Sequence, residues 1–457
     1  MNNSFLYPFT SKHGTLINRE DDLNLEEIVN FFTNIPKEQE YILKILYGLE
    51  VNKDIIEFRF EVISEFISNQ NLCNKLIEAF KTVSRLESEY SHIKIQFSRG
   101  KSDINYYISF FTSLYTDTCD LLISLLKVYE QIYHALSSIE IKSRGLKHLF
   151  AIVDKTDFGE LIKLCEKLKS ENFVGVKLLM DKFYKILDAE IVVEDEFNDK
   201  KTKSRLNGYN TILNFGKVKI TKDLIKIYKE LSVFNEYAEE MAFIKFAIKY
   251  YNFLKEKNIP ITNPSFKNKM NITNLYNLSL LIKARNKKID PQFVNLESDD
   301  AGIIITGDND TGKTIYLQSI GIAQVFAQAG LFIPAEAAVF KIYDNLIAYF
   351  TSQENIDVGG KFENECLFVS KYIKNCEANT LLLLNEIFQS TNDIDGSEVL
   401  YNVLLYLTGK DVKWILVTHL NHIQNKFANL EFKNQYKINN LVASIDNQKY
   451  EITEKLD

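Results

Sequence analysis

The residues best suited to chemistry in this chain are Gly307–Thr314, which run Gly-Asp-Asn-Asp-Thr-Gly-Lys-Thr and match the pattern GxxxxGK[ST]. They follow an apolar run at residues 302–306 and precede a stretch of helical spacing at residues 313–329. Glycines let backbone N–H groups curl around phosphate oxygens, and the start of a helix adds a partial positive charge. The pattern predicts a phosphate-binding loop; the alternative is a glycine turn that binds nothing. In such a loop Lys313 would bridge the β- and γ-phosphates of a nucleotide, and the Thr314 hydroxyl would hold Mg²⁺.

A second candidate is the pair Asn385-Glu386, which follows the apolar run Leu381–Leu384. Phosphate-loop ATPases commonly end this strand with an acidic residue for the metal, and then a glutamate that orients the attacking water. Glu386 is therefore a candidate general base, and its alternative is a solvated glutamate at a helix start. Asn385 occupies the metal position without a negative charge, which predicts weaker Mg²⁺ binding or slower turnover.

A third candidate is His419, which follows Thr418 at the end of the apolar run 413–420. A histidine there can contact the γ-phosphate as a sensor. A lone histidine at a strand end is more often structural. The sensor hypothesis therefore depends on the phosphate loop and Glu386 occurring in the same chain. His422 lacks that placement, and we expect it at the surface.

The elements that must position these residues alternate along the second part of the chain. Residues 302–306, 380–387 and 413–420 are apolar runs, and residues 398–409 have helical spacing. Continuous apolar strands with helices between them are typical of a parallel sheet that is covered on both faces. We therefore expect an α/β domain over residues 291–457.

The first part of the chain is expected to be mostly helical. Residues 37–259 contain no proline, and an interior proline costs a helix about 3 kcal/mol. Helical spacing is present in the segments 38–49, 55–69, 103–137 and 221–257. The last has a heptad seam and stops before Pro260, which predicts a lever helix of roughly 50 Å at about 1.5 Å per residue. With short strands expected within residues 173–220, residues 1–290 form a predicted helical core and lever domain.

Charge and cysteine content exclude several classes of protein. The 457 residues include 54 Lys+Arg and 61 Asp+Glu, a net charge of −7 that argues against coating nucleic acid by bulk charge. Five cysteines without a CxxC pair favour a reducing cytoplasm, and the absence of a signal peptide or an apolar run near 18 residues predicts neither secretion nor a membrane span.

Two local clusters of basic residues are candidate contacts for nucleic-acid phosphates; the alternative is that they are solvated loops. They are Lys200, Lys201, Lys203 and Arg205, and Lys283, Arg285, Lys287 and Lys288.

Taken in order, several motifs resemble the ATPase domain of the MutS family: residues 306–314, 330–336, 343–350, 385–396 and 418–420. The segment 385–396 aligns without a gap with the family's D-E-I-G-R-G-T-S-T-Y-D-G, and Asn309 falls on the asparagine of the family's phosphate loop. The helical first part is similar to the family's core and lever region. The resemblance implies an ABC-type ATPase that uses ATP and Mg²⁺, binds DNA, and forms a homodimer with nucleotide sites completed in trans. The nucleotide-binding residues expected in this chain are Gly307, Asn309, Thr311, Gly312, Lys313, Thr314 and Gly360, with Thr314 and Asn385 at the metal and Glu386 and His419 in catalysis.

Departures from the family are also visible. The family's signature helix begins S-x-F-x-x-E, whereas this chain has Gly359-Gly360-Lys361-Phe362-Glu363-Asn364-Glu365, with Gly360 at the serine position. No arginine follows residue 300, so Lys361 or the N–H groups of the two glycines would have to stabilise transition-state charge. The length suggests a short paralogue without the mismatch-reading domain, and we interpret the Phe-x-Glu triplets at residues 158–160 and 234–236 as chance.

These observations leave three functional hypotheses. The first is an ATP-dependent DNA-binding dimer in which nucleotide state moves long levers. The second is an ATPase switch of the same architecture that acts on RNA, a ribosome or a protein. The third is a nucleotide-binding protein with negligible hydrolysis, which Asn385 and Gly360 keep open.

Overall fold

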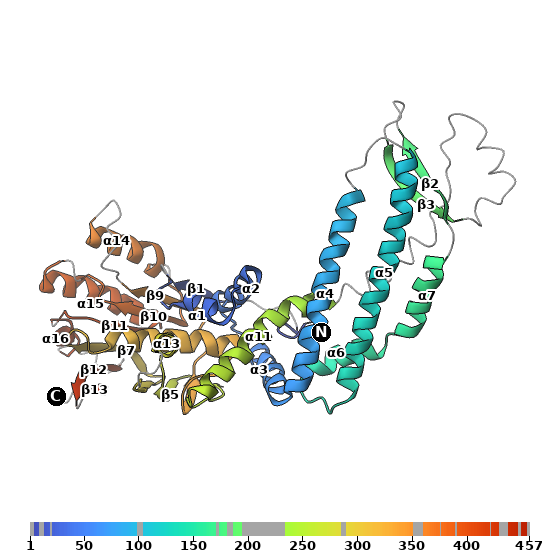
Figure 1. Cartoon of the computed structure of the whole chain (residues 1–457). Helices are drawn as coiled ribbons and strands as arrows, with labels where there is room; N and C mark the ends of the chain where they lie inside the picture. The colour runs from blue at the N-terminus through green and yellow to red at the C-terminus, as the bar shows by residue number, and fades with distance from the viewer. Residues whose placement is uncertain are drawn as a thin grey trace. The chain divides into compact units, whose positions relative to one another are not determined.

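Most of the chain is described by the structure, which is a computed structural model. The described residues are 4–8, 13–18, 21–97, 104–170, 173–180, 186–193, 234–284, 289–350, 360–374, 376–388, 391–420, 422–428, 437–446 and 449–454. They form two compact units (Figure 1). One comprises residues 1–5 and 64–241, and the other comprises residues 6–63 and 242–457.

The second unit is built on a seven-stranded sheet. In spatial order its strands are β1 (Thr15–Asn18), β9 (Asn345–Phe350), β10 (Thr380–Asn385), β11 (Lys413–Val417), β7 (Asp300–Gly307), β12 (Lys437–Asp446) and β13 (Lys449–Glu454). Each neighbouring pair is parallel except β12–β13, which is antiparallel. β10 and β11 are buried along their whole length, as expected of strands covered on both faces. The predicted α/β fold with a parallel-rich sheet is confirmed.

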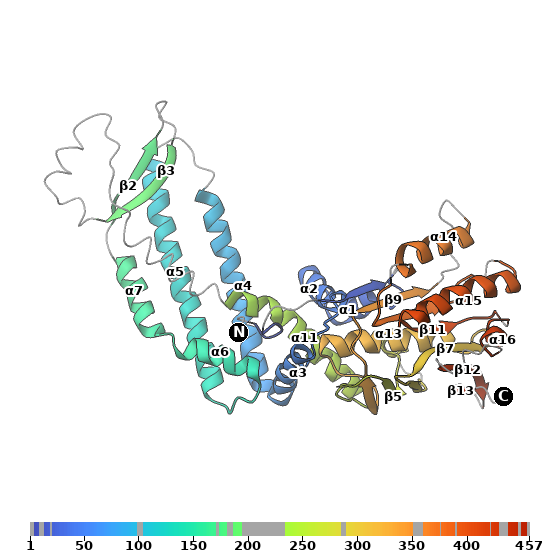
Figure 2. The same ribbon diagram turned by 180° about the vertical axis from the view of Figure 1, so that it is seen from behind.

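Helices cover both faces of this sheet. Alternation along β10 points Leu382 and Leu384 to one side, where they join a core with α15 (Asp393–Gly409) and α16 (His422–Ala428). Leu383 points to the other side, toward Gly321 of α13 (Lys313–Ala329). Figure 2 shows α13 and α15 running along the strands. Both helices therefore hold fixed positions relative to the strand ends that carry the candidate residues.

Further elements complete this unit. A smaller mixed sheet has the order β4 (Ser265–Phe266), β8 (Ala337–Phe340), β5 (Met270–Leu275) and β6 (Gln292–Leu296). The remaining helices are α1 (Leu25–Phe32), α2 (Pro36–Tyr47), α12 (Leu278–Lys283) and α14 (Lys361–Phe368), the last followed by a π-helical turn at Val369–Ile373.

Residues 6–63 belong to this sheet-containing unit, which differs from the single boundary near residue 290 that the sequence suggested. β1 pairs in parallel with β9, and the carboxylate of Asp22 accepts a hydrogen bond from the Phe350 N–H at 2.9 Å. Tyr250 packs edge-on against Phe326 of α13, with ring centroids 5.3 Å apart. These pairings join residues far apart in the chain, so local patterns could not place the boundary.

The first unit is mostly helical, with α4 (Gln70–Phe97), α5 (Ile104–Ser137), α6 (Arg144–Asp154) and α7 (Phe158–Ser170). α4, α5 and α7 run side by side, and an antiparallel hairpin of β2 (Phe173–Met180) and β3 (Ile186–Val193) lies beside α5 (Figure 1). The carboxylate of Glu65 accepts hydrogen bonds from the N–H groups of Lys142 and Ser143, at 2.7 and 2.6 Å, and fixes the entry to α6. Helices α3 (Lys53–Ser68) and α11 (Phe234–Glu256) each have residues in both units.

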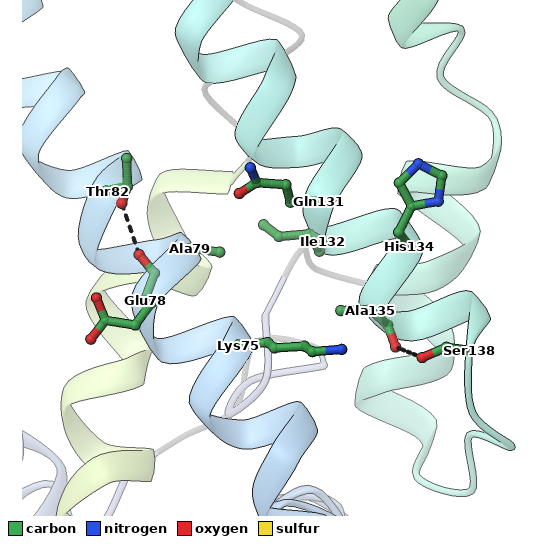
Figure 3. A pocket seen from close by; sticks show the side chains of 9 residues that line it. All are labelled: Lys75, Glu78, Ala79, Thr82, Gln131, Ile132, His134, Ala135 and Ser138. Atoms are coloured by element: carbon green, nitrogen blue, oxygen red, sulfur yellow. Dashed lines mark hydrogen bonds between the residues drawn. The ribbon is translucent and has the colours of Figure 1, made fainter.

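A groove of about 470 Å³ lies between α4 and α5 (Figure 3). Two buried alanines, Ala79 and Ala135, and the buried Ile132 line it. The rest of the lining is polar and of mixed charge: Lys75, Glu78, Thr82, Gln131, His134 and Ser138.

Most of the elements expected from the sequence are present. The predicted helical segments 38–49, 55–69 and 103–137 correspond to α2, α3 and α5, and the strand expected at the start of 173–220 is β2. Of the lever helix predicted at 221–257, the structure describes Phe234–Glu256 as helix. Residues 194–233, which include the rest of the segment where short strands were expected, lie outside the described residues. Among the described helices, none combines the length and apolar character needed to cross a membrane.

Candidate nucleotide site

The loop between β7 and α13 has the backbone geometry that a phosphate cradle requires. Gly307 ends the strand with φ 134°, and a Cβ there would lie 2.2 Å from the carbonyl oxygen of Ala443 on β12. Gly312 precedes the helix with φ 81°. Side chains rarely adopt either conformation, so glycine is needed at both ends of the loop. The loop predicted from the sequence is formed where strand meets helix.

Lys313 is folded back over its own loop. Its Nζ donates hydrogen bonds to the carbonyl oxygens of Gly307 and Asp308, at 2.8 and 2.6 Å. Burial lowers the pKa of Lys313 below its ordinary value, and the charges of Glu386, Asp308 and Asp310 partly oppose that shift. A partly dehydrated ammonium that donates to two neutral carbonyl oxygens is well suited to exchange them for phosphate oxygens.

Two oxygen ligands for a cation lie together. The Thr314 hydroxyl donates to Oδ1 of Asn385 at 3.1 Å, joining the first turn of α13 to the end of β10. Hydroxyl and amide oxygens suit a hard cation that keeps several of its waters, so this pair fits Mg²⁺ bound with a nucleotide. In the part of the chain that the structure describes, no cluster of three or more His, Cys, Asp or Glu side chains offers a separate metal site.

The two predicted catalytic side chains face each other. His419 Nε2 lies 3.1 Å from Glu386 Oε1, and each side chain is about one-third exposed. The Glu386 N–H donates to the carbonyl of Val417, and the Thr418 N–H donates to that of Ile305, which keeps the ends of β10, β11 and β7 aligned. Glu386 adopts φ 56°, a left-handed conformation that is uncommon for a residue with a side chain. Glu386, His419 and the predicted phosphate loop therefore meet at the carboxyl edge of one parallel sheet.

Comparison with known proteins agrees with this geometry. The family model for MutS domain V matches residues 303–456, about a third of the chain. Residues 303–456 thus match a MutS domain, and the chain resembles proteins of the MutS family.

Similar proteins include several repair proteins. A DNA mismatch repair protein MutS from Prochlorococcus marinus is 30% identical over 185 residues, which cover 39% of this chain and 20% of that protein. The DNA mismatch repair protein MSH3 from Candida glabrata is 26% identical over 280 residues, covering 50% and 27% respectively. An endonuclease MutS2 from Lactobacillus acidophilus is 32% identical over 135 residues, covering 29% and 17%. The match thus spans roughly a quarter or less of these relatives.

The MutS signature segment is only partly described. Gly360 precedes α14 with φ −64° and ψ 150°, is exposed, and has no atom within 4 Å of the position that a Cβ would occupy. Gly359 lies outside the described residues, as does the side chain of Lys361. A role for Gly360 at a partner's nucleotide stays a prediction, as do nucleotide contacts by Asn309, which is exposed, and by Thr311, whose hydroxyl bonds to the Asp308 carbonyl at 2.7 Å.

Two residues without a role in the sequence-based predictions also contact the candidate nucleotide site. The amide of Gln424 on α16 donates to the Thr306 hydroxyl at 3.2 Å, next to the phosphate loop. The amide of Asn277 donates to the Ile315 carbonyl at 3.1 Å and to the Ser319 hydroxyl at 3.0 Å, and so anchors α13 just after the loop. Neither contact has a local sequence signal, because both join segments that are distant in the chain.

The remaining expectations concern surface residues. His422 is exposed, 3.7 Å from Asp393, as predicted. Lys283 is exposed and pairs with Glu27 at 2.8 Å, whereas the other seven residues of the two basic clusters lie outside the described residues.

Proposed function

We propose that this chain is a MutS-like, ABC-type ATPase that binds ATP with Mg²⁺, hydrolyses it, and acts on DNA as a homodimer whose nucleotide sites are completed in trans. The observation that carries the proposal is the convergence of Lys313, the Thr314–Asn385 pair and the Glu386–His419 pair at one sheet edge. DNA is supported as the partner by relatives that are named as DNA mismatch repair proteins.

The mechanism follows from what each side chain can do. Backbone N–H groups of the loop and the Lys313 ammonium would hold the β- and γ-phosphates. Thr314 and Asn385 would orient Mg²⁺, which supplies positive charge against the phosphate oxygens. Glu386 would accept a proton from the attacking water, and His419, within 3.1 Å of that carboxylate, would fix its direction and contact the γ-phosphate.

A second candidate function is a nucleotide-binding switch with negligible hydrolysis. It is favoured by Asn385, which leaves the metal position without a carboxylate, and by Gly360, which provides no hydroxyl to a partner's nucleotide. An ATPase that acts on RNA, a ribosome or a protein partner has the same nucleotide site, so only binding experiments distinguish it.

The direct test is single-turnover hydrolysis of ATP with Mg²⁺ by the parent and by Lys313→Ala. We expect the parent to hydrolyse ATP and Lys313→Ala to lose nucleotide binding, while Lys371→Ala, which changes an exposed lysine on the same unit, behaves as the parent. A parent that binds but does not hydrolyse ATP would favour the switch without hydrolysis. Salt-dependent binding to duplex, branched and mismatched DNA and to RNA, with and without ATP, then identifies the partner.

A further inference from the structure

Helix α14 is tied to the catalytic turn through a buried carboxylate. Oε2 of Glu365 accepts a hydrogen bond from the backbone N–H of Phe388 at 3.0 Å, and Glu365 is only 1% exposed. The Phe362 and Phe388 rings also lie near each other, with centroids 5.7 Å apart. The bond therefore lies inside the unit, between α14 and the residues that follow β10.

The turn that receives this bond has an unusual backbone. Glu386 and Phe388 both adopt left-handed conformations, with φ 56° and 62°, and Ile387 between them is fully buried in the core. Non-glycine residues hold such conformations only when their surroundings impose them. The N–H groups at the two ends of the turn have acceptors on different elements. The Glu386 N–H donates to the carbonyl oxygen of Val417 on β11, and the Phe388 N–H donates to the carboxylate of Glu365 on α14.

These two restraints hold the backbone from which the Glu386 side chain extends. The first belongs to the sheet and cannot move without breaking strand alignment. The second belongs to a helix whose first turn follows the exposed Gly360. A displacement of α14 would thus act on the turn through Glu365.

We propose that Glu365 is a positioning residue, which holds Glu386 in its productive direction through the Phe388 N–H and makes hydrolysis in one subunit depend on the position of α14. The proposal rests on the proposed ATPase function and deepens it by adding a regulatory link. If the start of α14 meets the nucleotide of a second copy, each subunit would sense its partner's site through the Glu365–Phe388 hydrogen bond.

The experiment compares the parent with Glu365→Leu and Glu365→Gln. Leucine fills a similar volume without an acceptor, so we expect single-turnover hydrolysis to slow by about 10- to 100-fold, with the affinity for a non-hydrolysable ATP analogue within about twofold. Glutamine retains an acceptor oxygen and should recover a rate within about fivefold of the parent. Glu363→Gln is the matched control, because Glu363 is exposed on the same helix.

A double variant separates positioning from general support of the fold. If Glu365 acts through Glu386, then Glu365→Leu combined with Glu386→Gln should hydrolyse ATP no more slowly than Glu386→Gln alone. A structural role would instead add its own loss to that of Glu386→Gln. Such additive losses would overturn the proposal.

Other outcomes are equally decisive. A parent without hydrolysis contradicts the ATPase function itself, whereas an active parent with an unchanged Glu365→Leu rate contradicts only the positioning role. Should Glu365→Leu fail to fold, Glu365→Asp replaces it, since aspartate keeps the charge but is one methylene shorter. A parental rate in Glu365→Asp would then overturn the proposal, and a slower rate at unchanged analogue affinity would support it.

Discussion

The Thr314 hydroxyl donates a hydrogen bond to Oδ1 of Asn385, with the two oxygens 3.1 Å apart. This bond joins the phosphate loop to the strand that carries Glu386, and it directs an amide oxygen rather than a carboxylate toward the position expected for the metal. Asn385 is 5% exposed, so its replacement by aspartate would bring a nearly buried negative charge to that position.

The first prediction concerns this residue. We expect Asn385→Asp to lower the Mg²⁺ concentration for half-maximal hydrolysis by about tenfold, because a charged acceptor binds a cation-bound water about twice as strongly as a neutral one. Titration of single-turnover hydrolysis with Mg²⁺ measures it. Asn425→Asp, on the exposed side of α16, is the control. An identical Mg²⁺ dependence in Asn385→Asp and the parent would remove Asn385 from the metal site.

Glu386→Gln should leave ATP binding within a few-fold of the parent and slow hydrolysis by roughly 10²–10⁴-fold, the usual contribution of a general base. Glutamine preserves the shape of the side chain, whose carboxylate oxygen lies 3.1 Å from His419 Nε2 in the parent. Rapid-quench hydrolysis and analogue binding, measured on the same samples, separate the two effects. A hydrolysis rate equal to that of the parent would exclude Glu386 as the base.

The sequence predicted the core of this site because each part has a local signal. One apolar strand is followed by Gly307–Thr314 and a helix, and another is followed by Asn385-Glu386. Because both strands belong to one parallel sheet, the polar residues that follow them lie at the same edge. Long-range pairings have no such signal. The joining of β1 to β9 and the bond from Phe388 to Glu365 depend on segments that meet only in the folded chain, so composition and periodicity could not reveal them.

The lowered pKa of Lys313 predicts a pH dependence of ATP binding. Burial disfavours the charged ammonium in the free site, and bound phosphates favour it, so binding raises this pKa and takes up a proton. Affinity should therefore fall as pH rises through the window between the lowered pKa of the free site and the higher pKa of the complex. Calorimetry in buffers of different ionisation enthalpy detects the proton uptake. Lys313→Arg should flatten the pH dependence, because the guanidinium stays charged.

A further prediction concerns the stability of the seven-stranded sheet, which the fluorescence of Trp414 can follow. Gly302 on β7 faces its register partner Trp414 on β11, and a Cβ at Gly302 would lie 2.3 Å from the indole ring. Gly302→Ala should lower the free energy of unfolding by about 1–3 kcal/mol, the usual range for an overpacked core. Trp414 is the only tryptophan, so its fluorescence during denaturant unfolding follows this sheet.

A matched substitution lies in the same unit. Gly409 ends α15 and has no atom within 4 Å of the position of a Cβ. Gly409→Ala should leave stability unchanged or raise it by up to about 1 kcal/mol through a smaller loss of backbone entropy. Equal effects of the two substitutions would contradict the tight Gly302–Trp414 contact.

The proposed homodimer is tested at Gly360. This residue is exposed, and its φ of −64° and ψ of 150° suit any side chain, so Gly360→Ser and Gly360→Glu should both fold with melting curves close to the parent's. In the proposed dimer the start of α14 faces the γ-phosphate of the partner. A carboxylate there would repel the phosphate and prevent closure, whereas a serine hydroxyl would add a hydrogen-bond donor.

We therefore expect a non-hydrolysable ATP analogue to dimerise the parent, to dimerise Gly360→Ser at lower protein concentration, and to leave Gly360→Glu monomeric. Moving an open–closed equilibrium from 1:99 to 99:1 needs about 5.5 kcal/mol of differential binding, and the repulsion of a carboxylate against a phosphate is of a size to cancel much of that. Sedimentation velocity with saturating analogue measures all three proteins. A parent that stays monomeric at tens of micromolar with the analogue bound would refute the dimer and, with it, completion of the nucleotide site in trans, even if hydrolysis by the single chain is intact.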